Sequence, residues 1–245
     1  MSGKLLVHEI YLSIQGESTY AGLPCVFVRL TGCDLRCSYC DTAYAFKGGK
    51  PMTVEEISYA INEMSTSYKG KQLKGQSLPL IELTGGEPLL QKNCPLLMTQ
   101  LCDAGYTVLI ETSGAHPIQN LDPRIRKIMD LKCPSSGESD RMLWDNIQHL
   151  TYQDEIKCVI ATHEDYEWCK AQIEKWELEK RCEILFSWCA PLTESQRNPS
   201  LNPSPSTDDL ISRQALIERM IEDALPARFQ AQLHKIVWPP DAMGV

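Results

Sequence analysis

Three cysteines stand close together in one short segment, and they constrain this chain more than any other feature. Residues 31–42 read TGCDLRCSYCDT, so Cys33, Cys37 and Cys40 follow a C-x3-C-x2-C spacing. Ordinary packing has little use for such a density of thiols, because an isolated buried cysteine acts as a small hydrophobic residue. The segment is therefore expected to hold a metal centre.

The spacing leaves two kinds of centre open. A structural zinc site needs four ligands, usually from two separated pairs, and the chain has no second pair. The other eight cysteines are scattered, mostly in apolar segments. An iron–sulfur cube takes thiolate ligands, and three of them leave one iron open to a substrate or cofactor. Both zinc and an iron–sulfur cluster fit the spacing alone.

Composition excludes several classes of protein. The net charge of −8 opposes non-specific binding to nucleic acid or to an anionic membrane. The sequence contains no apolar run of about 18 residues, which a transmembrane helix would need, and its N-terminus does not resemble a signal peptide. Eleven cysteines are an odd number for disulfide pairing, so we expect a cytoplasmic protein with reduced thiols.

Strands and helices alternate along the chain, which predicts βα units and a parallel sheet. Six strands are expected, at residues 25–32, 78–83, 106–112, within 125–132, 155–160 and 182–187. Helices are expected at 53–64, where Thr53 and Glu56 form a capping box, at 95–105, at about 163–180 and at 208–225, where Thr207 is the predicted cap. Six strands are too few for a complete eightfold barrel.

The organisation is that of one domain, residues 1–245. Residues 193–208 are polar and rich in Pro and Ser, which predicts an exposed loop, and residues 208–245 form a C-terminal helix plus tail. In the first predicted strand, Val26, Val28 and Leu30 share one face, and Phe27 and Arg29 share the other.

Three further short motifs follow predicted strands. TGGEP at 84–88 combines glycines, which let a ligand approach the backbone, with Pro88, which also suits a tight turn into a helix. ETSG at 111–114 and PSSG at 134–137 place small hydroxyl residues at strand ends, where α/β sheets bind ligands. Each is a weak signal by itself.

The cysteine spacing, with an aromatic residue before the last cysteine, resembles the radical S-adenosylmethionine (radical SAM) superfamily. The segments HEIYLSIQGES, GLPCVFVRLTGCDLRCSYCDTAYA, LTGGEPLLQ, ETSG, DLKCPSSG and LHKIVWP, taken in order, resemble the 7-carboxy-7-deazaguanine synthase family of queuosine biosynthesis. That resemblance implies a partial, modified (β/α) barrel, a homodimer, and a reductant protein such as flavodoxin as partner.

The same resemblance implies the reaction. The family converts 6-carboxy-5,6,7,8-tetrahydropterin into 7-carboxy-7-deazaguanine with loss of ammonia, using a 4Fe–4S cluster, SAM and Mg²⁺. A radical generated from SAM takes the hydrogen at C6 of the pterin, the ring contracts, and SAM is regenerated. No side chain of the protein is implied as the radical carrier.

Site residues are implied position by position. The cluster ligands would be Cys33, Cys37 and Cys40, and Thr42 would bind Mg²⁺. The SAM contacts would be Tyr39, Asp41, Gly86, Ser135, Ser136 and Ser187. The substrate contacts would be Ile14, Gln15, Gly16, Glu17, Arg29, Thr84 and His234. Without the resemblance, Thr42 could be an N-cap, Arg29 a partner of a surface acid, and His234 a structural histidine.

Two alternatives of other classes remain. An activase of a glycyl radical enzyme shares the cysteine spacing but places its radical on a protein partner, and SIQGE and HK would then have no explanation. A zinc- or cluster-binding module in complex assembly is the other. Residues 239–245 run past the point where many members of the family end, so a substrate contact from the terminal carboxylate is in doubt.

Overall fold

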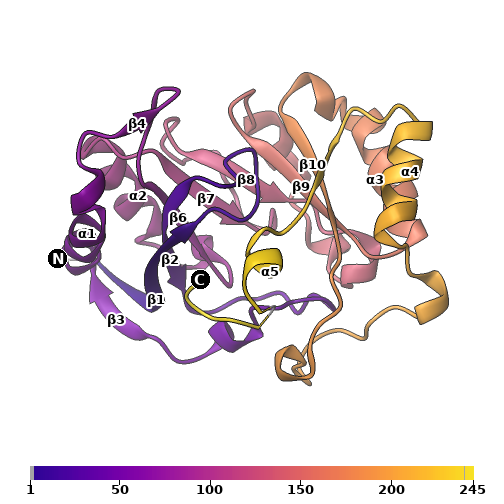
Figure 1. Ribbon diagram of the computed structural model, residues 1–245, viewed down its shortest axis with the longest axis horizontal. Coiled ribbons are helices and arrows are strands. Elements are labelled where there is room, and N and C mark those ends of the chain that lie inside the picture. Colours follow the sequence, from indigo (N-terminus) through magenta and orange to yellow (C-terminus); the bar gives the residue numbers. More distant parts are fainter. Residues whose placement is uncertain (1–2, 240) are drawn as a thin grey trace.

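A mostly parallel β-sheet forms the centre of the molecule (Figure 1). The computed structural model describes residues 3–239 and 241–245, and in these residues nine strands pair in the order β11-β10-β9-β8-β7-β6-β2-β1-β3. The strands are β1 (Lys4–Ile14), β2 (Pro24–Leu30), β3 (Lys50–Thr53), β6 (Leu80–Gly85), β7 (Val108–Thr112), β8 (Arg126–Asp130), β9 (Glu155–Ile160), β10 (Glu183–Trp188) and β11 (Arg228–Gln230). The short strands β4 (Gln72–Leu73) and β5 (Gln76–Ser77) form a separate ribbon.

All six predicted strands are present, as β2, β6, β7, β8, β9 and β10, and each pairs in parallel with its neighbour. The short β11 extends this parallel part beyond β10. Sequence patterning missed β11 and the two strands at the other edge, β1 and β3, which pair antiparallel. Most residues of β1 are only partly buried, so its alternation of apolar and polar residues is weak.

Helices cover the sheet in two groups, as Figure 1 shows. α1 (Val54–Ser65) and α2 (Cys94–Asp103) lie beside the β1–β7 half, and α3 (His163–Trp176) and α4 (Arg213–Glu222) lie beside β9 and β10. The short α5 (His234–Val237) lies between these groups. In the part of the chain that the structure describes, the β7–β8 and β8–β9 connections contain no α-helix. The fold is therefore a partial, modified (β/α) barrel.

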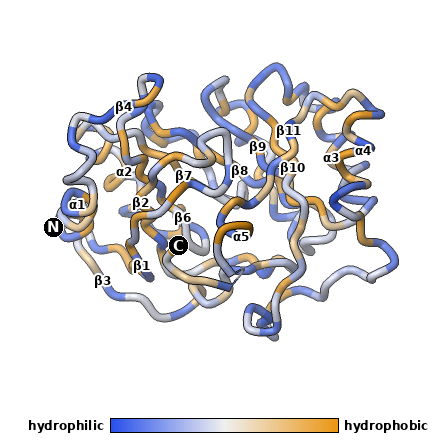
Figure 2. The backbone as a smooth tube through the Cα atoms, in the orientation of Figure 1, coloured by the Kyte–Doolittle hydropathy of each residue, from blue (hydrophilic) through white to orange (hydrophobic). Residues whose placement is uncertain are grey.

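Two hydrophobic layers attach the helices to the sheet. One packs Val26 and Val28 of β2 against Ile57 and Ile61 of α1, and the other packs Phe186 of β10 against α3 and α4. Figure 2 shows the hydrophobic residues along β2 and β7. The predicted two faces of β2 are confirmed, since the helix-facing residues are fully buried and Arg29 points away from them. The opposite face of the sheet carries Arg29 and also a smaller buried apolar cluster that includes Cys25, Phe27, Leu80, Leu109 and Ile128.

Helix ends differ in how well the sequence predicts them. The capping box of α1 is confirmed: Thr53 Oγ1 accepts from Glu56 N–H at 3.1 Å, and Glu56 accepts from Thr53 N–H at 2.7 Å. α3 ends at Trp176, earlier than predicted, because Glu177 adopts a left-handed conformation with φ of 49°. None of the helices within the described ranges is long and apolar enough for a membrane crossing.

The predicted start of the last helix is wrong. α4 begins at Arg213 rather than near residue 208, and its cap is Ser212, whose hydroxyl accepts from Ala215 N–H at 3.0 Å. Thr207 instead begins a single 3-10 turn, Thr207–Asp209, so its hydroxyl does not cap the helix. Thr207 and Ser212 are both N-cap residue types, and the observed cap is the serine, which is preferred over threonine at this position.

Replacing Ser212 with alanine should lower the free energy of unfolding by about 1 kcal/mol, because one backbone N–H of α4 loses its acceptor. The matched control Thr207→Ala should change it by less than about 0.5 kcal/mol. Urea unfolding of the anaerobic protein followed by circular dichroism measures both. A larger effect at Thr207 than at Ser212 would show that the helix starts where the sequence predicted.

Candidate active site

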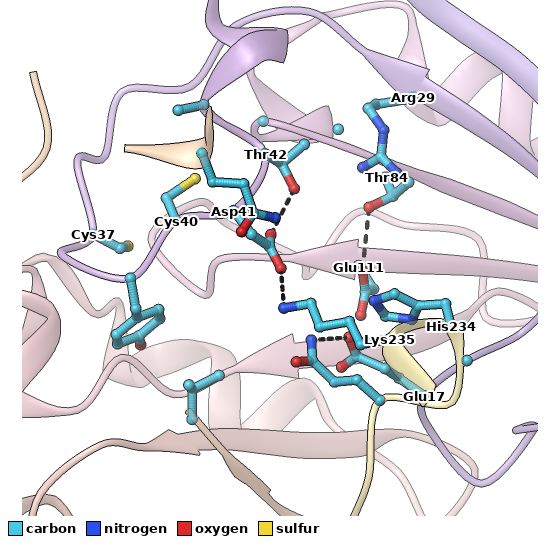
Figure 3. A pocket seen from close by; sticks show the side chains of 18 of the residues that line it. Glu17, Arg29, Cys37, Cys40, Asp41, Thr42, Thr84, Glu111, His234 and Lys235 are labelled. Atoms are coloured by element: carbon cyan, nitrogen blue, oxygen red, sulfur yellow. Dashed lines mark hydrogen bonds and ion pairs between the residues drawn. The ribbon is translucent and has the colours of Figure 1, made fainter. Parts of the chain in front are cut away.

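A cavity of about 520 Å³ opens at the carboxyl ends of the parallel strands. Figure 3 shows that Cys37 and Cys40 lie on one side of it, with Arg29, Thr84, Glu111 and His234 on the other. All the predicted site residues line this cavity except Ser135 and Ser136. Parallel strands bring distant segments to one edge of a sheet, so the residues meet although they span much of the chain.

The three-cysteine segment is an extended loop fixed by its own backbone. Cys40 N–H donates to Cys37 O at 3.1 Å, and Leu35 N–H donates to Cys33 Sγ at 3.4 Å. Burial raises the pKa of Cys33 to about 11 and that of Cys40 to about 12. As free thiols they stay protonated at neutral pH, and binding a metal is what would deprotonate them.

The arrangement of the cysteines suits a cluster better than a single ion. Residues 3–239 and 241–245 hold no group of three or more His, Cys, Asp or Glu side chains that could hold one metal ion. In an iron–sulfur cube each thiolate binds a different iron, so the three sulfurs need not converge on one point. All three cysteines nonetheless face the same cavity.

The PSSG motif supports the cysteine loop and does not enter the cavity. Ser38 N–H donates to Ser136 O at 3.0 Å, and Ser38 Oγ donates to Ser135 O at 2.7 Å. The hydroxyl of Ser135 is bound to Asp165 at 2.5 Å, and that of Ser136 is buried against Cys133 O at 2.6 Å. The structure therefore does not bring these two serines to the predicted SAM contacts, because their hydroxyls already have partners in the protein.

The GGE motif packs directly under the cysteine loop. Gly85 has φ of 143°, a conformation that favours glycine, and Glu87 N–H donates to Gly32 O at 2.8 Å. A Cβ atom built on Gly86 would lie 2.8 Å from Cys33 Cβ and still closer to Gly32 O. The glycine is thus needed for the contact between the β6 turn and the cysteine loop.

Glu87 of the same motif is structural. It is fully buried, and its carboxylate accepts from Ser113 N–H at 2.7 Å, from Thr112 Oγ1 at 3.0 Å and from Leu89 N–H at 2.8 Å. The motif therefore ties the end of β6 to the end of β7. Pro88 begins a 3-10 turn, as expected for a tight exit from the strand.

Asp41 and Thr42 connect the cysteine loop to the C-terminal segment. Asp41 accepts from Lys235 Nζ at 2.6 Å and from Thr42 Oγ1 at 2.9 Å (Figure 3). Burial alone would raise the pKa of Asp41, but the Lys235 charge and these hydrogen bonds hold it below its ordinary value. Thr42 precedes a 3-10 turn without capping it, and a hydroxyl that donates its proton keeps lone pairs for a cation.

Arg29 lines the cavity and is also paired. Its Nε lies 2.7 Å from Glu9 Oε1, and its Nη2 donates to Tyr11 OH at 3.0 Å. Both partners come from β1, which the sequence did not predict as a strand. Glu9 and Tyr11 therefore orient the guanidinium, which also lines the cavity.

Charged side chains from the loop after β1 and from the parallel strands line one side of the cavity. This charged floor consists of Glu17, Glu82, Glu111, Asp130 and Lys157. Gln15 contacts Glu82 through its side-chain amide and accepts from Glu17 N–H at 3.0 Å. Thr84 Oγ1 donates to Glu111 Oε2 at 3.2 Å. Burial, and next the charge of Glu111, raise the pKa of Glu82 well above its ordinary value.

Sequence analysis missed several charged residues that line the cavity, namely Glu82, Glu111, Asp130, Lys132, Lys157 and Lys235. A usable signal existed for three of them. The apolar strands LIEL, LIET and EIKCVI contain Glu82, Glu111 and Lys157, as the apolar strand CVFVRL contains Arg29. Charged side chains are almost never fully buried unless they are paired, so each interruption indicates a partner on another strand.

The C-terminal segment closes one side of the cavity. Leu233 N–H donates to Gly16 O at 2.9 Å, which places His234 directly against Gly16. Residues 241–245 and 195–198 also line the cavity, and Ser195 Oγ donates to Asp241 Oδ2 at 2.8 Å. The predicted exposed loop thus meets the tail at the mouth of the site.

Comparisons with known proteins agree with this geometry. A family model described as Radical SAM superfamily matches residues 27–135. The 7-carboxy-7-deazaguanine synthase of Koribacter versatilis is 39% identical over 241 residues, covering 98% of this chain and 99% of the relative. That of Chlorobaculum tepidum is 39% identical over 244 residues, covering 98% and 97%.

Solved structures show the same fold. QueE from Escherichia coli matches with a TM-score of 0.65 at 19% identity, covering 94% of this chain and 95% of that one. Streptococcus suis SuiB bound to S-adenosylmethionine matches with a TM-score of 0.55 at 14% identity, covering 82% and 48%. At these identities the likeness extends to the fold alone.

Gly86→Ala should disturb the cysteine loop, since overpacking of a well-packed contact costs about 1–3 kcal/mol. We expect lower iron content and lower absorbance near about 400 nm after anaerobic reconstitution. The control is Gly3→Ala, where the three atoms nearest to a new Cβ belong to the side chain of Asn93, which is not part of the cysteine loop at residues 31–42. Normal iron content in Gly86→Ala would contradict the close packing of the two loops.

Proposed function

The chain belongs to the 7-carboxy-7-deazaguanine synthase family of radical SAM enzymes, and from this membership we infer the reaction that its cavity carries out. It converts 6-carboxy-5,6,7,8-tetrahydropterin into 7-carboxy-7-deazaguanine with loss of ammonia, in queuosine biosynthesis. Its relatives match almost end to end at 39% identity, which gives the activase alternative less support.

One observation carries the assignment. A single cavity has three cysteines on one side and, on the other, groups suited to a carboxylated pterin. Arg29 is a cation suited to the carboxylate, and Glu17 and Glu111, which line the same cavity, are acceptors suited to the N–H groups of the ring (Figure 3). Proximity of a radical source to a bound substrate is what this chemistry requires of the protein.

Cys33, Cys37 and Cys40 would hold the 4Fe–4S cluster that the family uses. SAM, when bound at the open iron, supplies the radical that abstracts hydrogen from the substrate. Tyr39, Asp41, Gly86 and Ser187 would contact SAM, and all four line the cavity. The Tyr39 hydroxyl supports this role, because it is buried with no hydrogen-bond partner among the described residues, so a ligand group could satisfy it.

Residues on the other side would bind the substrate. Arg29 can hold its carboxylate, since a guanidinium forms two parallel hydrogen bonds with that group. Residues 14–16 and Glu17 would follow the edge of the pyrimidine ring, with Thr84 and His234 as further contacts. The C-terminal segment docks on Gly16 at this side, through the hydrogen bond from Leu233 N–H to Gly16 O.

Magnesium would bind at Thr42, whose oxygen faces the cavity near Asp41. Mg²⁺ prefers oxygen ligands and keeps several of its waters. One protein hydroxyl and the substrate carboxylate would therefore be enough to complete its coordination. We further infer a cytoplasmic, single-domain homodimer that receives electrons from a reductant protein such as flavodoxin.

Anaerobically reconstituted protein should form a deazaguanine chromophore from SAM, reductant and 6-carboxytetrahydropterin, with SAM not consumed in stoichiometric amounts. Omitting magnesium should lower the rate, because the substrate carboxylate loses one anchor. Ultraviolet absorbance and mass spectrometry measure the product. Cleavage of SAM without any deazapurine, by protein with an intact cluster, would favour the activase alternative.

Arg29→Ala should weaken substrate binding by about 10- to 100-fold, the range expected when hydrogen bonds to a charged group are lost. Cluster absorbance should stay unchanged, because Arg29 contacts Glu9, Tyr11 and the ring of Tyr44 but none of the residues 31–42 that carry the cysteines. The matched control Arg124→Ala removes an exposed arginine that pairs with Asp103 and Asp122, and it should bind substrate normally. Loss of the cluster in Arg29→Ala would mean that this arginine is structural.

A further inference from the structure

A buried lysine stands at the centre of the charged floor. Lys157 lies in the middle of β9 on the face toward the cavity, and its side chain is only 8% exposed. Its register partner in β8 is Asp130, so the two side chains lie on the same face of neighbouring strands. A cation taken this far from water needs partners of opposite charge.

Lys157 has carboxylates from three other elements around its ammonium group. Nζ lies 2.6 Å from Glu111 Oε1 of β7, 3.1 Å from Glu17 Oε2 of the loop after β1, and 3.6 Å from Asp130 Oδ1. The first two contacts are hydrogen bonds, and the third is an ion pair. One cation therefore bridges Glu17 and Glu111, which are far apart in sequence.

The two bridged carboxylates are also held at their other sides. Glu17 accepts from Gln230 Nε2 at 2.9 Å and from Gln232 Nε2 at 2.9 Å, and Glu111 accepts from Thr84 Oγ1. Burial alone would raise the pKa of Glu17, but the Lys157 charge, followed by that of His234, holds it at about 2. Glu17 is thus ionised, and both carboxylates are fixed in position.

Removing Lys157 would leave these carboxylates facing one another. The other charged or titratable groups that face the cluster are Glu82, Asp130, Lys132, Arg29 and His234. Among the cations in this set, Lys132 pairs with Asp130 at 2.8 Å and Arg29 pairs with Glu9. Without the Lys157 charge, burial would favour protonation of Glu17, and a protonated carboxyl is a poorer acceptor.

We propose that Lys157 is a positioning residue that holds Glu17 and Glu111 together as acceptors for the 2-amino edge of the pyrimidine ring of the substrate. This inference rests on the proposed function. A 2-amino-4-oxo ring presents adjacent N–H donors at that edge, which suit two carboxylate oxygens. A 2-oxo ring presents a carbonyl there, which cannot donate to these acceptors. Lys157 therefore sets the preference for pterins over lumazines.

The test uses two stable probes, 6-carboxypterin and 6-carboxylumazine, whose binding to the anaerobic, cluster-loaded protein is followed by fluorescence and calorimetry. The unaltered protein should prefer the pterin by about tenfold or more, since a site built for a donor rejects an analogue that lacks it. In Lys157→Met the pterin affinity should fall at least about tenfold, and the preference should shrink to within about threefold.

The pH profile gives a readout that a merely structural role would not move. In the unaltered protein, pterin affinity should stay flat from about pH 5 to about pH 7, because Glu17 is ionised throughout that range and the pterin keeps its N3–H donor. In Lys157→Met, the raised pKa of Glu17 means that this acceptor is lost at the acidic end, so affinity should rise with pH. Lys157→Arg keeps the charge and should restore both the flat profile and the preference.

Lys127→Met is the matched control. Lys127 is also a buried lysine with a carboxylate partner, Asp154 at 3.0 Å, but it does not line the cavity. The Lys127→Met variant should leave the pterin preference and the pH profile unchanged. A folded, cluster-loaded Lys157→Met protein with normal affinity and preference overturns the proposal.

If Lys157→Met does not fold, the variant Lys157→Gln/Glu111→Gln replaces it, since it removes one charge of each sign. Compared with Glu111→Gln alone, it should lose at least about threefold more pterin affinity, because Glu17 also loses its cation. Equal affinities would overturn the proposal. Failure of the unaltered protein to bind 6-carboxypterin would instead reject the proposed function itself.

Discussion

Side chains alternate between the two faces of a parallel strand, and the position of the cavity depends on this constraint. In β2, Val26, Val28 and Leu30 pack toward the helices, which leaves Arg29 on the opposite face. The same alternation turns Thr84, Glu111, Asp130, Lys157 and Ser187 toward the cavity, each from a different strand. A shift of one residue in any strand would bury its charged group among the helices and expose its apolar ones.

Ionised groups gathered beside a hydrophobic sheet need compensation within the protein. The structure provides it by pairing charges across elements: Lys157 with Glu17 and Glu111, Lys132 with Asp130, Arg29 with Glu9, and Lys235 with Asp41. Breaking such a pair by removing one partner is strongly destabilising, because the other charge stays buried. The same pairing orients the polar groups of the cavity before a substrate binds.

Backbone groups, more than side chains, hold the cysteine loop in place. The carbonyls of Ser135 and Ser136 accept from Ser38, and the carbonyl of Gly32 accepts from Glu87 N–H. Gly86 allows the β6 turn to approach Cys33, and Glu87 secures that turn to β7. The GGE and PSSG motifs, which look like ligand contacts in the sequence, thus also support the cysteine loop. The thiols of this loop face the cavity.

The sequence by itself determined the features that depend on neighbours in the chain. The cysteine spacing, the six parallel strands, the Thr53–Glu56 capping box and the inward face of Arg29 follow from local periodicity and side-chain chemistry. Tertiary structure alone decided which residues far apart in sequence meet: Lys157 with Glu17, Lys235 with Asp41, and Glu9 of an unpredicted strand with Arg29. It also turned the hydroxyls of Ser135 and Ser136 away from the cavity. The physical reason is that alternation and capping act over a few residues, whereas pairing of buried charges depends on strand order and register, which no local pattern encodes.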